Sequence, residues 1–207
     1  MTRRRRLLHA LDAHRAAFAA RLDALPEAVV HASPAPGAWS LAQLAEHLLL
    51  IDSGLRFDGA PASLAVRRTS RMRSTGIQAV LSLPLRIKGP PSAAYVMPTA
   101  APRWPEVRDR WAALRAGWMR EPDDDGAVAF VHPIAGPFLL DDALAFLLAH
   151  HRHHDAQLRR TLRGVSGLAG SRRSSRLSSD GSANPRNLRD PPDPTNPCTT
   201  LPASPVI

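Results

Sequence analysis

Apolar side chains recur three and four residues apart in four stretches of the chain, the spacing of one face of an α-helix. The stretches cover residues 5–25, 40–57, 105–121 and 140–163. Each is two to three heptads long and carries polar residues on its other face. The pattern predicts an all-α protein in which four amphipathic helices pack as a bundle.

The second of these stretches has a clear helix-start signal. Ser40 can accept a hydrogen bond from the first helical turn, and Gln43 can return one to the backbone of Ser40. Trp39 can pack against Leu44 across the same turn. This pattern predicts a capped helix that begins at Ser40.

Two segments lack helical periodicity. Residues 58–103 contain six prolines and, we expect, one short helix at 76–85. A connection of this length lets the second and third helices lie parallel, and such long loops are often functional. Residues 165–207 hold eight serines, seven prolines and no Phe, Trp or Tyr, so we expect a disordered tail. The predicted organisation is a helical domain at 1–164 followed by this tail.

The composition restricts the class of protein. A single cysteine, Cys198, excludes an intramolecular disulfide and a cysteine-based zinc site. No apolar run approaches the roughly 20 residues of a membrane span, and the arginine-rich start lacks an apolar signal core. We expect a cytoplasmic protein that does not bind membranes.

The chain carries a formal net charge of +9, and Lys88 is its only lysine. Arginines gather at residues 3–6 and, without any acid, at residues 67–88. Such patches can attract an anionic ligand or partner. No aromatic residue is interleaved with these bases for stacking on nucleotides, which disfavours nucleic acid as the partner.

Four histidines crowd one turn of the last predicted helix. At about 100° per residue, His150, His151 and His154 fall on the buried side and His153 faces solvent. His150 and His154 are one turn apart, so both imidazoles can bind one metal ion. His47, at the edge of the buried stripe of the second helix, is the candidate third ligand. Three imidazoles without a fourth protein ligand would leave metal positions open to water or substrate, as in catalytic sites.

Other interpretations of the histidines stay open at this point. A histidine on an apolar face is commonly a core residue with a hydrogen-bond partner, which is our interpretation of His14. The four-histidine run could also be a surface tract that binds metals without a defined site, or a consequence of composition alone. His132, before Pro133, is expected to shape a turn.

The exposure and the partners of other polar residues near the histidines can also be predicted. We interpret Glu46 as an exposed charge rather than an acceptor for His47, and expect Asp155 to pair with Arg152 or Arg159. Gln157 either orients a ligand or is a surface amide. The tryptophans are expected in the core; they are Trp39, Trp104, Trp111 and Trp118.

Three segments, in order, resemble motifs of the DinB/YfiT-like superfamily of bacterial metal-binding four-helix proteins. They are residues 34–47 (a P…W-S-…-H pattern), 132–138 (H-P-x-x-G-x-F) and 150–158 (H-x-R-H-H-x-x-Q). The resemblance implies a bundle of up-up-down-down order, and a divalent metal held by His47, His150 and His154. It covers roughly residues 5–163, while the connection at 67–91 matches nothing in the family pattern.

The resemblance implies a metal-dependent enzyme of the thiol-S-transferase or hydrolase type. Zinc is the default metal, with nickel, manganese and iron as alternatives, and the substrate class includes low-molecular-weight thiols. A homodimer is compatible with the resemblance. Two rival hypotheses are a non-catalytic metal-binding or stress-related bundle, and a protein that binds anions or nucleic acid through its arginine-rich segments.

Overall fold

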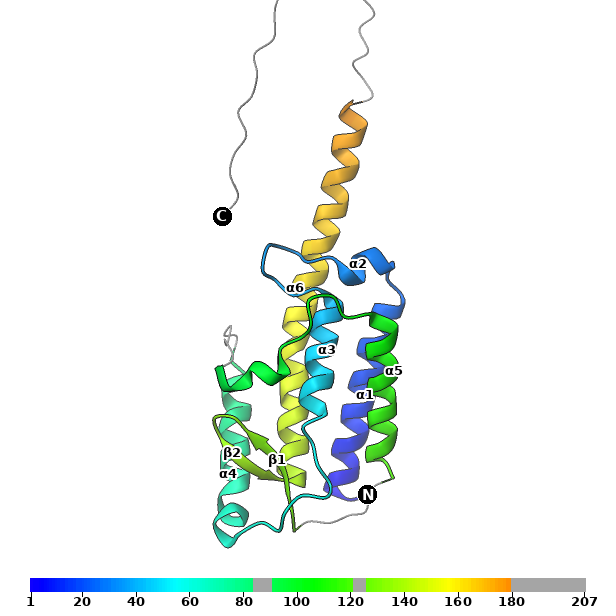
Figure 1. Cartoon of the computed structure of the whole chain (residues 1–207). Helices are drawn as coiled ribbons and strands as arrows, with labels where there is room; N and C mark the ends of the chain where they lie inside the picture. The colour runs from blue at the N-terminus through cyan, green and yellow to red at the C-terminus, as the bar shows by residue number, and fades with distance from the viewer. Residues whose placement is uncertain (84–90, 121–125, 180–207) are drawn as a thin grey trace, which may run out of the picture. The chain divides into compact units, whose positions relative to one another are not determined.

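A computed structural model describes residues 1–83, 91–120 and 126–179, and for residues 92 and 166–179 only the secondary structure is considered. The chain is mostly helical with a small two-stranded sheet. Its elements are α1 (Arg3–Asp23), α2 (Glu27–His31), α3 (Leu41–Asp52), α4 (Leu64–Leu81), the 3-10 helix η1 (Pro91–Val96), α5 (Trp104–Trp118), β1 (Val128–His132), β2 (Gly136–Leu139) and α6 (Leu140–Ser179) (Figure 1). None of the described helices has a stretch long and apolar enough to cross a membrane.

Four of these helices, α1, α3, α5 and α6, correspond to the four predicted stretches. Residues 1–171 form one compact unit, which contains all the contacts described below, and a second unit begins at Arg172. Helix α6 continues to Ser179, past the expected end near Arg163. The remainder of the expected tail, residues 180–207, lies outside the described residues.

The order of helix directions differs from the expected up-up-down-down. Arg4 and His14 of α1 bond to Asp141 and Asp155 of α6, so these two helices run parallel. Trp104, at the start of α5, bonds to Asp23 at the end of α1, so α1 and α5 run in opposite directions. Helices α3 and α5 run parallel, as the long connection between them allows. The observed order of directions for α1, α3, α5 and α6 is therefore up-down-down-up (Figure 1). The expected order came from the family resemblance, whereas residues 24–40, which join α1 to α3 and contain α2, reverse the direction of the chain.

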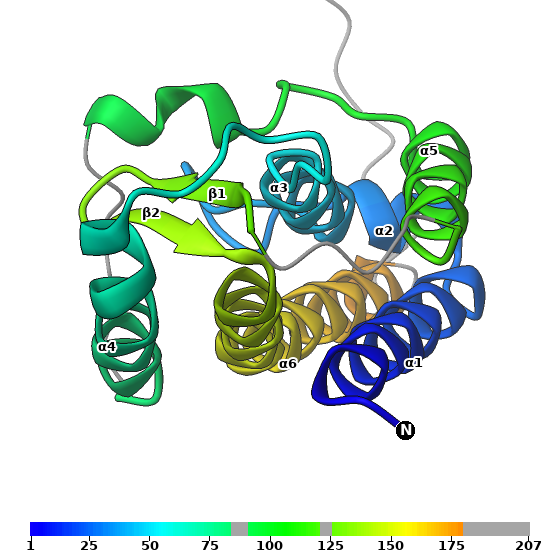
Figure 2. The ribbon, with the colours of Figure 1, turned by 90° about the horizontal axis from the view of Figure 1, so that it is seen from below.

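The segment between α3 and α5 contains an 18-residue helix, α4, where a loop with one short helix was expected. The buried residues of α4 are Ser70 and Ser74, and Ile77 and Leu81 pack against the core further along, so apolar periodicity did not reveal the first part of this helix. Ser70 donates a hydrogen bond to Asp142 Oδ2 at 2.7 Å, and Ser74 donates to the Asp142 carbonyl oxygen at 2.7 Å. Both serines are buried. Seen along the helices, α4 lies beside the two-stranded sheet, away from α1 and α5 (Figure 2).

The sheet is an antiparallel hairpin that leads directly into α6. Phe130 pairs with Phe138 and His132 with Gly136. Gly136 has a φ of 80°, a left-handed conformation that glycine adopts without strain. His132 Nδ1 accepts hydrogen bonds from the backbone N–H groups of Ile134 (3.1 Å) and Ala135 (3.0 Å). The expectation that His132 shapes this turn is therefore confirmed, although the strands around it were not predicted.

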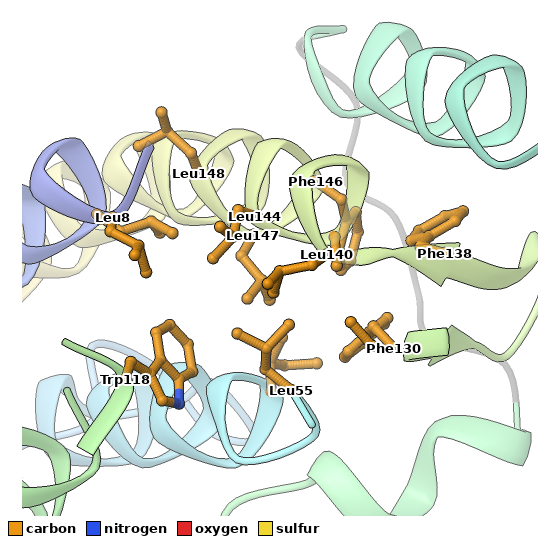
Figure 3. Close-up of a cluster of buried hydrophobic side chains, with 14 of the residues drawn as sticks. Leu8, Leu55, Trp118, Phe130, Phe138, Leu140, Leu144, Phe146, Leu147 and Leu148 are labelled. Atoms are coloured by element: carbon orange, nitrogen blue, oxygen red, sulfur yellow. The ribbon is translucent and has the colours of Figure 1, made fainter. Parts of the chain in front are cut away.

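The core continues from the helices onto the hairpin. Near the start of α6, Leu8, Leu55 and Trp118 face a cluster from α6 and the strands (Figure 3). A second cluster surrounds Trp111, toward the other end of α3. Trp104, Trp111 and Trp118 are buried as expected, and Trp39 is partly buried.

The predicted start of the second helix is confirmed in detail. Ser40 Oγ accepts from the Gln43 N–H at 3.2 Å, and Gln43 Oε1 accepts from the Ser40 N–H at 3.0 Å. This reciprocal capping box satisfies two backbone donors at the helix end. It fixes the first turn of α3, which ends at Leu44. His47 follows about one turn later.

Two glycine substitutions should have opposite effects on stability. At Gly59 an added Cβ would collide with the Val128 carbonyl group, which is backbone and cannot move aside cheaply, so Gly59→Ala should be strongly destabilising. At Gly76, inside α4, an added Cβ meets nothing within 4 Å. Gly76→Ala should raise the free energy of unfolding by roughly 0.5–1 kcal/mol, because alanine favours a helix over glycine. Urea unfolding of both variants checks this, and equal effects would contradict the close approach at Gly59.

Candidate metal centre

The three histidines predicted as metal ligands come together between α3 and α6. His47 lies in the middle of α3, and His150 and His154 lie one turn apart on α6. Each offers one ring nitrogen to a common point, and the three nitrogens lie within 4.8 Å of one another. Among the described residues, no fourth His, Cys, Asp or Glu belongs to this group.

Hydrogen bonds fix the orientation of two of the rings. His47 Nδ1 lies 2.7 Å from the Val96 carbonyl oxygen, and His154 Nδ1 lies 2.8 Å from Gln157 Oε1. Both partners are acceptors, so each Nδ1 carries the hydrogen and each Nε2 of the neutral ring keeps its lone pair. Metal-binding histidines commonly have such a partner on the outer nitrogen. Gln157 thus contacts the site, the first of the two alternatives expected for it.

The separation of the two inner nitrogens on α6 fits a shared divalent ion. His150 Nε2 and His154 Nε2 are 3.2 Å apart. Two nitrogens bound to one tetrahedral zinc ion at about 2.0–2.1 Å are separated by about 3.3 Å. Two facing lone pairs at this distance repel, so either a proton or a cation has to lie between them. His150 Nδ1 is buried and has no hydrogen-bond partner.

The surroundings keep all three rings neutral. Burial lowers the pKa of His154 to about 3, and the nearby His47 adds to this shift. Burial also lowers the pKa of His150 well below its usual value, with His154 contributing. It lowers the pKa of His47 as well, against the opposing effect of the hydrogen bond that His47 donates to the Val96 carbonyl oxygen. Neutral imidazole is the form that binds metal ions, so these groups need not lose a proton at neutral pH.

Acidification should therefore destabilise the metal-free protein. The unfolded chain protonates its histidines near pH 6.5, whereas folded His154 stays neutral to about pH 3. The unfolded state binds more protons in this interval, so stability present above pH 6.5 is lost as the pH falls. The loss should reach up to about 1.4 kcal/mol per pH unit for each such histidine. Urea unfolding between pH 7 and 5 checks this, and a His154→Gln variant with an unchanged slope would contradict it.

Aromatic rings line the histidine group on two sides. The Trp39 ring lies 4.9 Å from that of His47, and the Phe146 ring lies 5.7 Å from that of His150. His132 packs edge-on against Phe146 at 5.0 Å. These contacts reduce the water around the rings and join the hairpin to the site.

A second buried polar cluster lies next to the histidine group. Asp52, fully buried, accepts hydrogen bonds from His151 Nε2 at 2.9 Å and from Trp111 Nε1 at 2.7 Å. Helical spacing predicts that His151 faces the interior, but it assigns no role to Asp52. The only sequence feature that could have indicated its role is that Asp52 is an acidic residue at the end of an otherwise apolar helix face.

Two expectations about polar pairs have different outcomes. His14 bonds to Asp155 at 3.0 Å, which confirms that it has a hydrogen-bond partner, although it is only partly buried and does not lie in the core. The expected pairing of Asp155 with Arg152 or Arg159 is wrong, because the parallel neighbour α1 brings His14 closer.

Two further expectations about exposure are wrong. Glu46 is only 6% exposed and accepts hydrogen bonds from Thr99, because the segment after η1 covers this flank of α3. His153 is half-buried, and its Nδ1 lies 2.8 Å from the Leu81 carbonyl oxygen at the end of α4. Both predictions considered each helix alone. In the structure, the segment after η1 covers Glu46 and the end of α4 covers His153.

The arginine-rich segments are only partly free. Arg3 and Arg4 form ion pairs with Asp142 and Asp141 at the start of α6, at 3.7 and 3.2 Å. Arg67 donates hydrogen bonds to backbone carbonyl oxygens of Ala62 and Gly126. Arg86 and Lys88, the last two basic residues of the segment 67–88, lie outside the described residues.

Comparison with known proteins identifies the family. The family model described as the DinB superfamily matches residues 10–158, more than two thirds of the chain. The matched region contains all three histidines of the group. No curated protein and no solved structure matches the chain.

Proposed function

This chain belongs to the DinB superfamily, and from that premise we propose that it is a metal-dependent enzyme in which His47, His150 and His154 hold one divalent ion. Zinc is the default because three imidazoles are a usual ligand set for it, while nickel, manganese and iron have related preferences. The observation that carries the proposal is the convergence of three neutral ring nitrogens, two of them with the outer nitrogen held by an acceptor.

The proposed reaction uses a thiol or a water molecule as the nucleophile. A divalent ion bound by three imidazoles lowers the pKa of a bound water, or holds a thiol as its thiolate, at neutral pH. The protein orients the rings through Val96 and Gln157 and excludes bulk water with Trp39 and Phe146. Three protein ligands leave room for such a nucleophile, which supports transfer or hydrolysis rather than a purely structural site.

Metal analysis and cobalt substitution test this proposal. Purified protein should carry about one divalent ion per chain. The cobalt(II) form, titrated with a low-molecular-weight thiol, should develop a thiolate-to-metal charge-transfer band if the thiol is the nucleophile. A spectrum that changes only with pH, near neutrality, would instead favour a bound water and hydrolysis. Absence of stoichiometric metal in the purified protein would remove the basis of the proposal.

The same measurements separate the rival functions. A retained metal whose cobalt spectrum responds neither to thiols nor to pH would favour a structural role in a non-catalytic bundle. Arg68 and Arg71 are exposed on α4, a helix without acidic residues. Binding of an anionic partner is therefore the second candidate function. DNA binding that falls steeply with salt and is lost in an Arg68→Gln/Arg71→Gln variant would support it.

A further inference from the structure

Residues 96–100, termed the strap below, lie along one flank of α3 and begin at Val96, the last residue of η1. Three side chains of α3 hold the strap, and their positions at i, i+3 and i+4 place them on one side of the helix. Gln43 Nε2 donates to the carbonyl oxygens of Thr99 (3.0 Å) and Ala100 (3.3 Å). Glu46 holds Thr99, and His47 donates to the Val96 carbonyl oxygen. The strap therefore supplies the acceptor that orients His47.

Glu46 makes the most tightly defined of these attachments. Its Oε2 accepts from the Thr99 N–H at 2.6 Å and from Thr99 Oγ1 at 2.9 Å. The side chain is buried, so the carboxylate has given up most of its hydration, and Thr99 supplies two donors in exchange. Hydrogen bonds to an ionised acceptor are stronger than neutral ones. The pair thus anchors the strap at Thr99.

This anchor limits where the Val96 carbonyl group can lie. Only Met97 and Pro98 lie between Val96 and Thr99, and the three residue steps between them span at most about 11 Å. If Val96 moved away, the buried Nδ1–H of His47 would lose its acceptor. The ring would then turn toward another acceptor or carry its hydrogen on Nε2, and Nε2 would no longer offer a lone pair to the shared point.

We propose that Glu46, acting through Thr99 and the strap, is a positioning residue that fixes the tautomer and orientation of His47. The inference rests on the proposed function in one respect only, that the oriented nitrogen binds a metal ion. Among the described residues, Glu46 does not belong to the group of possible metal ligands, and its hydrogen bonds go to Thr99. Gln43 also holds the strap, but it completes the capping box of α3, so substituting it would not separate the two roles.

Three variants test this inference. Glu46→Ala removes both hydrogen bonds, Thr99→Val removes only the hydroxyl donor, and Glu46→Gln keeps an acceptor oxygen for the Thr99 N–H. Zinc affinity, measured by competition with a chromogenic chelator, should fall by about 10–100-fold in Glu46→Ala, as for other outer partners of metal ligands. The loss should be smaller in Thr99→Val and smallest in Glu46→Gln.

A control separates positioning from general stability. Ser70→Ala loses two buried hydrogen bonds, to Asp142 and from the Leu139 N–H, far from the strap in sequence. It should lower the unfolding midpoint while leaving zinc affinity within about twofold of wild type. An equal loss of affinity in Ser70→Ala and Glu46→Ala would overturn the inference.

A second measurement does not depend on metal. Long-range ¹H–¹⁵N spectra of the metal-free protein report which ring nitrogen of His47 carries the hydrogen, with the signal assigned by its absence in His47→Gln. Wild type should show the Nδ1–H form, and Glu46→Ala a mixture of tautomers. An unchanged tautomer with unchanged zinc affinity in Glu46→Ala and Thr99→Val would overturn the positioning role and leave the proposed function standing. A wild type without zinc affinity would remove the proposed function, and the tautomer would still decide the role of Glu46.

Discussion

Replacement of His154 by alanine should remove the metal from the purified protein, lowering its content from about one ion per chain to less than about 0.1. The substitution deletes one of three nitrogens that lie within 4.8 Å of one another and leaves His150 Nε2 without its neighbour at 3.2 Å. Two ligands from different helices hold a divalent ion far more weakly than three. Inductively coupled plasma mass spectrometry after gel filtration measures the metal content.

His153→Ala is the matched control for this prediction. His153 is adjacent in sequence and half-buried, but its Nδ1 faces the Leu81 carbonyl oxygen and it is outside the group of three. This variant should keep its metal. Loss of metal from both variants, or from neither, would mean that the histidine run binds metal without the geometry described here.

Replacement of Asp52 by alanine should lower the free energy of unfolding by about 3–5 kcal/mol, the range for removing one partner from a buried charged or polar pair. Trp111 Nε1 and His151 Nε2 would both lose their acceptor in the interior, where no water replaces it. The side chains of Asp52 and His151 are 0% exposed, so solvent does not weaken the interaction. Urea unfolding followed by circular dichroism measures the change.

Asp58→Ala provides the comparison. Asp58 lies six residues further along the chain and pairs with Arg56, but both side chains are largely exposed, at 74% and 66%. Exposed pairs contribute little, so this variant should unfold at the same urea concentration as wild type. Similar midpoints for the two variants would contradict the buried network around Asp52.

The histidine group was predictable from the sequence because helical geometry is local. A spacing of four residues places His150 and His154 on one side of α6 whatever the rest of the fold does. The position of His47 followed from a legible helix start at Ser40, which fixed how far His47 lies along α3. The resemblance to the DinB superfamily joined these two local inferences into one site.

Features that depend on distant contacts were not predictable in the same way. Glu46 looks exposed on an isolated helix, yet Thr99, 53 residues away, covers it. The first part of helix α4 was missed because it is buried through the hydroxyl groups of Ser70 and Ser74 rather than through apolar side chains. The direction of α1 relative to α3 depends on the path of a connection whose turns have no strong sequence signal.

The hairpin illustrates a third limit, that of length. Its strands are five and four residues long, too short for alternation to be distinguished from a loop. Gly136 and the proline-containing turn before it were visible, and they correctly indicated a turn at His132. What the sequence did not contain was the pairing partner of each strand.

The most direct test of the proposed metal centre is a crystal structure of the purified protein with diffraction data collected on either side of the zinc absorption edge. We expect one anomalous peak between α3 and α6, bonded to Nε2 of His47, His150 and His154 at about 2.0–2.1 Å. At least one remaining position should be open to solvent. An anomalous peak elsewhere, or histidine rings of α3 and α6 that do not share an ion in protein with stoichiometric zinc, would contradict the assignment.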